Sequence, residues 1–245
     1  MSFDASRYLR FMSAGRQIGW LTPTLAARLG AWPAVFECGP EKVVLLNIRE
    51  FPSVVEALAA EGFIPGWRNE RYRIEDLFEI ERAAARPFGL TTHAVHVNGI
   101  SHDGKMWLAR RSATKPIDPG LLDNLVGGGL TSGLSIEQVL IKEAWEEAGI
   151  PAELARRARR GGGVRILREV PEGVQSELIE AYDLELPEGF RPANQDGEVS
   201  EFMLLPFAEV ERLELTFEAQ LVVRDFFSRP SARPGSGPAG AGPAT

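Results

Sequence analysis

Apolar and polar positions follow different patterns in the early and later parts of the chain. Before about Arg86, short helical and strand patterns are mixed, which predicts a small α+β domain with helices over 22–29, 53–61 and 76–85 and a strand over 42–47. From residue 91 apolar and polar residues alternate, which predicts strands over 92–100, 105–110, 164–170, 175–186 and 202–205. Asp103-Gly104 is typical of a hairpin turn, a short basic helix is expected over 151–160, and an amphipathic helical region is expected over 207–227.

The stretch LDNLVGGGLTSGLSIEQVLIKEAWEEAGI, residues 122–150, combines a glycine-rich segment with a helical pattern. Four glycines predict a loop: Gly127, Gly128, Gly129 and Gly133. Ser135 and Gln138 have the spacing of a capping box, which predicts the helix start. Gly149 followed by Ile150 and Pro151 predicts its end.

The expected inner face of this helix changes from aliphatic to acidic. At about 100° per residue, Glu143, Glu146 and Glu147 continue the face that Ile136, Val139 and Leu140 begin. Three carboxylates at this spacing repel each other, and Lys142 can pair with only one of them at i, i+4. Mg²⁺ accepts such hard oxygen ligands together with substrate phosphates. The pattern therefore indicates a metal site, and a solvated acidic helix end is the alternative.

Composition narrows the class of protein. The 245 residues can form one large domain or two small ones, and a hydrophobic content of 44% is ample for a core. A net charge of -7 argues against binding nucleic acid through bulk electrostatics. The single cysteine, Cys38, excludes an intramolecular disulfide, and the three histidines lack metal-ligand spacing and are expected to be strand or turn residues: His93, His96 and His102. No signal peptide or membrane-spanning stretch is evident, so we expect a cytoplasmic protein without a membrane partner.

The same stretch resembles the Nudix box, G-x5-E-x7-R-E-U-x-E-E-x-G-U, where U is aliphatic. Gly128 matches the first glycine, and residues 142–150 match the second half. Leu134 stands where the box has its first glutamate, and Lys142 and Ala144 replace the arginine and the aliphatic residue. In the family that glutamate pairs with the arginine and supports the site.

The resemblance implies a fold and a domain organisation. The expected fold class is α/β, a Nudix α/β/α sandwich with a mixed sheet, preceded by the small α+β domain. The expected boundaries are 1–88 for the N-terminal domain, which could recognise substrate, and 89–227 for the Nudix domain. The Gly/Pro-rich remainder, 228–245, is predicted to be disordered.

The resemblance also implies an activity. GWRNERY and RRSATKP look like a branch of Nudix hydrolases with an additional N-terminal domain. That branch includes plant and fungal enzymes acting on thiamine diphosphate and its oxidised forms, and it is related to a domain fused to fungal thiamine pyrophosphokinases. We therefore expect a Mg²⁺-dependent pyrophosphohydrolase, with Mn²⁺ possible, that releases a monophosphate and phosphate from a small-molecule diphosphate. The alternatives are hydrolysis of a nucleoside diphosphate derivative and a weakened, diphosphate-binding module. The chain is expected to be a monomer or homodimer.

The expected catalytic and metal residues lie on the acidic helix and in a later segment. Glu143, Glu146 and Glu147 would hold metal with a backbone carbonyl of Gly127 or Gly128. Nudix proteins often bring one more acid from a late loop. Glu198 is the first choice here, ahead of Asp196 and Glu201, although a plain turn acid is the alternative. The expected catalytic residues are therefore Glu143, Glu147 and Glu198.

Two groups of residues are candidates for substrate binding. Arg110, Arg111 and Lys115 precede the metal box and could contact a diphosphate, or they could cover a sheet edge. An aromatic and cationic group could contact the organic moiety, or it could form a surface hairpin with its aromatic rings packed inward: Trp67, Arg68 and Tyr72.

Overall fold

A computed structural model describes residues 3–115 and 117–230 of the chain, which form two compact units. The first unit comprises the chain up to Ala94 together with 129–135 and 165–178. The second unit comprises the remaining described residues. Two short pieces from the later chain are thus built into the N-terminal unit.

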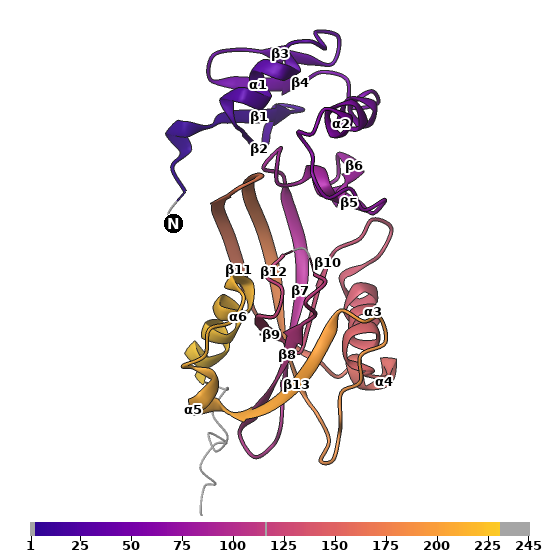
Figure 1. The fold of residues 1–245 in the computed structure, drawn as a ribbon, viewed down its shortest axis with the longest axis vertical. Helices are drawn as coiled ribbons and strands as arrows, with labels where there is room; N and C mark the ends of the chain where they lie inside the picture. The colour runs from indigo at the N-terminus through magenta and orange to yellow at the C-terminus, as the bar shows by residue number, and fades with distance from the viewer. Residues whose placement is uncertain (1–2, 116, 231–245) are drawn as a thin grey trace, which may run out of the picture. The chain divides into compact units, whose positions relative to one another are not determined.

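The first unit is organised around a four-stranded sheet and a two-stranded hairpin (Figure 1). The strand order in the sheet is β2-β1-β4-β3, with β1 parallel to β4 and antiparallel to β2. The hairpin consists of β5 and β6. The elements in chain order are η1 (Ala5–Arg7), β1 (Leu9–Ser13), β2 (Arg16–Leu21), α1 (Pro23–Leu29), β3 (Phe36–Cys38), β4 (Lys42–Leu45), α2 (Phe51–Ala60), β5 (Arg71–Ile74), β6 (Phe78–Glu81) and η2 (Arg82–Ala84).

Phenylalanine rings fill the core of this unit. Phe51 is fully buried, and its ring centroid lies 4.9 Å from that of Phe88 and 5.8 Å from those of Phe11 and Phe36. Edge-to-face contacts of this kind stabilise a core beyond the area they bury.

The predictions for this unit are partly confirmed. The helix expected over 22–29 is α1, whose first turn is capped by the Thr22 side chain, and the strand over 42–47 is β4. The second helix begins at Phe51 and its N-cap residue, Glu50, makes no side-chain cap. The helix expected over 76–85 is wrong. Phe78–Glu81 is a strand because its pairing with β5 buries Ile80 in the core, and only a 3₁₀ turn follows.

A seven-stranded sheet carries the second unit, and its strands β7, β10, β11 and β12 also contribute residues to the first. The order is β11-β12-β7-β8-β13, with β10 paired to β7 and β9 paired to β8. The elements are β7 (Thr91–Ile100), β8 (Lys105–Arg111), β9 (Leu122–Asn124), β10 (Val126–Gly129), α3 (Ile136–Ala148), α4 (Ala152–Ala155), β11 (Arg159–Val170), β12 (Gly173–Glu185), β13 (Val199–Pro206), α5 (Phe207–Val210) and α6 (Phe217–Ser228).

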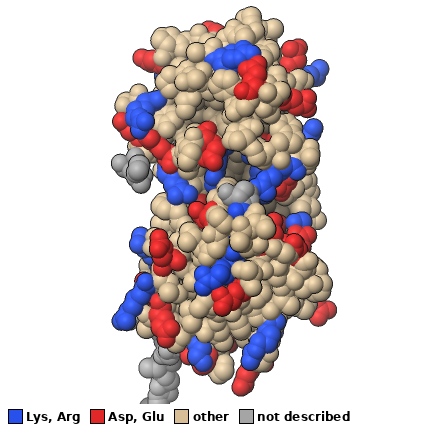
Figure 2. Space-filling model, in the orientation of Figure 1, with Lys and Arg blue, Asp and Glu red and all other residues tan. Residues whose placement is uncertain are grey.

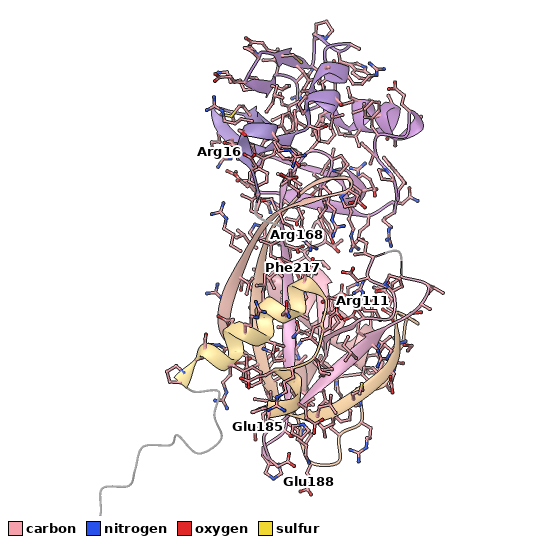
Figure 3. The ribbon with its side chains drawn as sticks, turned by 60° about the vertical axis from the view of Figure 1, so that its left-hand side comes forward. Arg16, Arg111, Arg168, Glu185, Glu188 and Phe217 are labelled. Atoms are coloured by element: carbon pink, nitrogen blue, oxygen red, sulfur yellow. The ribbon has the colours of Figure 1, made fainter. Side chains whose placement is uncertain are left out.

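Helices cover both faces of this sheet in the second unit (Figure 1). On one face α5 and α6 pack on β8 and β9 through a cluster that includes Met106, Leu122 and Phe226. Phe217, labelled in Figure 3, begins α6. On the other face α3 buries Val139 and Leu140. The result is a three-layer α/β/α arrangement.

The strand predictions after residue 91 are confirmed, and three other expectations need correction. The expected glycine loop is wrong at Gly127, Gly128 and Gly129, which belong to strand β10. The helical region over 207–227 is two helices, since Thr216 caps a new start. The basic helix after Pro151 ends at Ala155, because the next residues turn into β11.

The end of the described chain is part of the second unit. Ser228 ends α6, and Arg229 pairs with Asp183 and Asp225, so these first residues of the expected tail are packed. Residues 231–245, where the rest of that tail was predicted, lie outside the described residues. Among the helices that the structure describes, none has the length and apolar character needed to cross a membrane. Basic and acidic side chains intermingle over the face shown in Figure 2.

Candidate functional site

Glu147 is a buried carboxylate at the centre of the predicted metal site. It is 7% exposed, and its Oε2 accepts a hydrogen bond of 2.8 Å from the backbone N–H of Gly127. The pKa of Glu147 is raised to about 8, chiefly by burial; the hydrogen bond from the Gly127 N–H lowers it, the charges of Glu143 and Asp123 raise it, and Lys115 lowers it. The site therefore holds a carboxyl group whose ionised form needs a nearby cation.

Lys142 forms ion pairs with the two other carboxylates of the helix. Its Nζ lies 3.0 Å from Oε1 of Glu143 and 2.6 Å from Oε2 of Glu146. Burial lowers the pKa of Lys142, but these hydrogen bonds raise it well above its ordinary value. The sequence predicted only the i, i+4 partner. The adjacent glutamate is within reach as well because the lysine stem is long and flexible.

The carboxylates fit a divalent ion in their chemistry. Within 3–115 and 117–230, no three His, Cys, Asp or Glu side chains converge on one point as they stand. Lys142 draws Glu143 and Glu146 to itself, while Glu147 faces Gly127. Three oxygen donors on one helical turn, one of them buried, match the hard-ligand preference of Mg²⁺. A divalent ion bound here would balance the negative charge of the carboxylates, which the Lys142 ammonium now balances in part.

The three glycines of β10 leave room for three different side chains. None of Gly127, Gly128 and Gly129 has a positive φ, so the backbone itself would accept another residue. A Cβ on Gly127 would lie 3.1 Å from the His96 ring, and a Cβ on Gly128 would overlap the Glu143 side chain. A Cβ on Gly129 would overlap the Tyr72 hydroxyl. Glycine is required here by close approach rather than by a turn.

A buried polar network lies behind Gly127. His96 Nδ1 is 2.8 Å from Oδ1 of Asn124, and the Asn124 amide donates to Oδ1 of Asn98 at 2.9 Å. The Asn98 amide donates to Asp183 at 3.0 Å, and Asp183 in turn accepts from Arg229. Each member hydrogen-bonds to the next, so the network runs from His96 on β7 to Arg229 at the end of α6. His96 and His93 lie on β7 and His102 in the following turn, as predicted.

The late acidic segment docks on the C-terminal end of α3. The backbone N–H of Gln195 donates to the carbonyl of Glu146 at 2.7 Å, and that of Ala193 to the carbonyl of Ala148 at 3.0 Å. These contacts satisfy carbonyls that the helix end leaves open. Glu198 forms an ion pair with Lys115, and burial raises the pKa of Asp196. The structure thus brings the segment with Asp196 and Glu198, together with Lys115, to the C-terminal end of α3, whereas Glu201 pairs with Arg110.

The two candidate arginines have internal partners. Arg110 donates to Glu201 at 2.7 Å and to the carbonyl of Gly120 at 3.0 Å. Arg111, labelled in Figure 3, donates to Asp123 at 2.9 Å and to the carbonyl of Ile117. Both arginines are therefore paired with neighbouring acidic groups and carbonyls around β8, whereas Lys115 contacts Glu198 in the late acidic segment.

The aromatic candidates belong to the first unit. Trp67 is 39% exposed and its indole N–H donates to Asn69, whereas Tyr72 is 5% exposed and lies on β5. The backbone N–H of Arg68 donates to Glu81. The predicted hairpin is present, but only Tyr72 of the two rings packs inward.

Comparison with known proteins places this architecture in a family. The NUDIX domain model matches residues 92–226. The chain belongs to the Nudix family. Residues 1–92 match a domain of unknown function, DUF4743. The α/β/α layers of the second unit are therefore those of a Nudix sandwich, and the fold predicted from the sequence is confirmed.

Three relatives share both parts of the chain. Nudix hydrolase 24, chloroplastic, of Arabidopsis thaliana is 42% identical over 195 residues, covering 74% of this chain and 53% of the relative. Nudix hydrolase 20, chloroplastic, of the same plant is 41% identical, covering 74% and 52%. An uncharacterized protein of Saccharomyces cerevisiae is 31% identical, covering 68% and 56%. The chain spans about half the length of the curated relatives it matches.

The sequence reasoning missed the residues that support the site from behind. His96, Asn98 and Asn124 belong to no sequence motif. They meet because β7, which carries His96 and Asn98, and β9, which carries Asn124, both pair with β8. Polar residues at inward positions of otherwise apolar strands were the available signal, since buried polar groups need partners.

Proposed function

We propose that this Nudix chain is a divalent-metal-dependent hydrolase that cleaves an organic diphosphate to a monophosphate and phosphate. The observation that carries the proposal is the buried Glu147, whose pKa burial raises to about 8, on the same helix as Glu143 and Glu146. A buried carboxylate beside two others is costly unless a cation joins them. The family generally uses a divalent ion such as Mg²⁺.

Glutamates of this chain would bind the metal ion and accept the proton in the proposed reaction. Glu143, Glu146 and Glu147 would hold the ion, with a backbone carbonyl of Gly127 or Gly128. When bound, the ion supplies charge neutralisation at phosphate oxygens and acidifies a bound water. Water oxygen forms the new bond to phosphorus as the bridging P–O bond breaks, and the monophosphate carries away the bridging oxygen. A glutamate accepts the proton that the water loses.

Lys115 and Glu198 complete this arrangement. Their ion pair sits at the docked late segment, near enough for Lys115 to affect the pKa of Glu147. Lys115 would exchange Glu198 for a phosphate oxygen when substrate binds, which frees Glu198 to accept the proton. Glu143 is the second candidate for that role.

The proposed substrate is thiamine diphosphate or one of its oxidised forms. Support comes from the resemblance of RRSATKP and GWRNERY to the branch that acts on these compounds. A nucleoside diphosphate derivative is the competing substrate class, and a binding module without turnover is the competing function. The cytoplasmic location expected from the sequence belongs to the same proposal.

The test is product analysis with purified protein in the presence and absence of Mg²⁺. Thiamine diphosphate, its oxidised analogues, nucleotide sugars and dinucleotides are each incubated and the phosphate products are separated. Glu146→Gln is expected to lower kcat by at least about 100-fold, the loss typical of a disturbed metal site. Glu137→Gln is the matched control, since Glu137 lies on the same helix in its first turn, away from the three ligands. Turnover of nucleotide substrates alone would remove the thiamine assignment, and retained turnover in Glu146→Gln would remove the site assignment.

A further inference from the structure

The buried polar network behind Gly127 lies wholly within the second unit. Its members, in order along the hydrogen bonds, are His96, Asn124, Asn98, Asp183 and Arg229. The side chains of Asn98 and Asn124 are buried, so each amide group depends on a protein partner for its hydrogen bonds. The order of donors and acceptors is therefore set by the members of the network themselves.

The Asp183 carboxylate sets the direction of these hydrogen bonds. It pairs with Arg229 and can only accept, so Asn98 must offer its NH₂ group there, at 3.0 Å. The Asn98 carbonyl oxygen then accepts from the Asn124 NH₂ group at 2.9 Å. This leaves the Asn124 carbonyl oxygen facing Nδ1 of His96 at 2.8 Å. Nδ1 of His96 must therefore carry a hydrogen and donate it.

The imidazole ring of His96 packs on the backbone of Gly127. A Cβ on Gly127 would lie 3.1 Å from Cε1 and 3.3 Å from each ring nitrogen, so the ring fills the space that a side chain would need. On the next residue, Gly128, a Cβ would instead overlap Glu143, because successive residues of a strand face opposite sides. His96 and Glu143 thus flank β10 from its two faces.

Gly127 connects this ring to the buried carboxylate of the proposed metal site. Its backbone N–H donates to Oε2 of Glu147 at 2.8 Å. Pairing with β7 fixes β10 within the sheet, whereas displacement out of the sheet is limited by the side chains packed on its faces. A hydrogen bond weakens steeply when its angle bends, so a tilt of this peptide group would release the carboxylate. The orientation of the His96 ring thus affects Glu147 through one backbone N–H.

We propose that His96 is a positioning residue for the Glu147 carboxylate and that the polar network holds its ring in one orientation. This inference rests on the proposed function, because Glu147 is a proposed ligand of the metal ion. Partners that orient metal ligands typically change metal affinity by about 10–100-fold when they are lost. In this role His96 touches neither metal nor substrate and acts through Gly127.

The first experiment locates the imidazole hydrogen by ¹⁵N NMR of the full chain at pH 8, without metal. The chain has three histidines, and the signals of His96 are those that His96→Asn removes. We expect a hydrogen on Nδ1 in the wild type, and a bare Nδ1 would overturn the proposed network. In Asp183→Asn the new amide can present its oxygen or its NH₂ group to Asn98. Nδ1 should then lose its hydrogen in part of the molecules, because the end of the network that can only accept is gone.

Asp225→Asn is the matched control for Asp183→Asn. Asp225 also pairs with Arg229, at 3.1 Å, but it is not a member of the polar network. Both substitutions weaken an ion pair of the same arginine, and only Asp183→Asn changes the acceptor that faces Asn98. The control should therefore leave the hydrogen on Nδ1 of His96.

The second experiment measures Mn²⁺ binding to the full chain by electron paramagnetic resonance of the free ion, without substrate. His96→Asn keeps an N–H for Asn124 but places no ring on Gly127, so it should weaken binding by about tenfold. His93→Asn is its control on the same strand, β7, and should bind as the wild type does. Asp183→Asn should weaken binding by less than His96→Asn, because the ring remains on Gly127. Each of these two variants provides a readout if the other does not fold.

The outcomes separate the two proposals. If wild type binds Mn²⁺ and His96→Asn binds it as well as His93→Asn does, the positioning role is refuted and the metal site remains. If Asp183→Asn matches Asp225→Asn in either measurement, the network does not hold the ring, and that part of the proposal is overturned. If wild type binds no Mn²⁺, or if Glu146→Gln binds it as well as wild type does, the metal site itself is refuted and the positioning role falls with it.

Discussion

Replacing Glu147 by glutamine should stabilise the metal-free protein while it removes the proposed activity. Glutamine keeps an oxygen that can accept the 2.8 Å hydrogen bond from Gly127 but carries no charge to bury. Glu147 is 7% exposed, so its ionised form has lost most of its hydration. The native carboxylate is thus expected to reduce stability wherever it is ionised in the unfolded chain.

The magnitude follows from the raised pKa. Below pH 4.5, the ordinary value for glutamate, the carboxyl is protonated in both states and has no effect. Between 4.5 and about 8 the unfolded chain has released the proton that the native state retains, so stability falls as pH rises. At about 1.4 kcal/mol per pH unit, the loss at pH 7 is about 3 kcal/mol. For a protein of this size that is roughly 6–12 °C in Tm.

The assay is thermal unfolding in EDTA at pH 5, 7 and 8. The difference in Tm between Glu147→Gln and wild type should be near zero at pH 5 and should grow with pH. Glu137→Gln, on the exposed first turn of the same helix, should show no such trend. Added Mg²⁺ should narrow the difference, since an ion that binds only the native wild type stabilises it. A variant with a Tm equal to or below that of wild type at pH 7 and 8 would contradict the burial argument.

Three further changes probe the packing. Asn98→Ala removes the amide that joins buried Asn124 to half-buried Asp183, and urea unfolding should show a loss of about 1–3 kcal/mol; no loss would mean that water replaces the amide. Phe51→Ala empties the centre of the aromatic core and should cost about 3–5 kcal/mol in the first unit, measured the same way; a cost near zero would mean that the core collapses around the gap. Gly149→Ala is strained by a φ of +65° and by a carbonyl oxygen 2.8 Å from the new Cβ, so its Tm should fall. Gly163→Ala on β11 is the control, since a Cβ there meets only one backbone oxygen, at 3.8 Å, and its Tm should not change.

The sequence by itself determined the elements with strong local signals. Alternation predicted the strands from residue 91 onward, and helical periodicity with Gly149 as its stop predicted α3. The order of the box residues was enough to indicate the Nudix family, because the box has its glutamates at a fixed spacing within one turn of a helix. These features depend on near neighbours in the chain.

Other features depend on residues distant in sequence, and only the tertiary structure decided them. The strand at Phe78–Glu81 forms because β5 is available to pair with it, although its local pattern also suits a helix. The glycine run looked like a turn, yet its members are glycines because His96, Glu143 and Tyr72 approach from three separate elements. The ion pairs of Arg110 and Arg111 likewise appear only when β13 and β9 lie beside β8. Local periodicity reports what a segment can form, whereas close approach of distant side chains is a property of the folded chain alone.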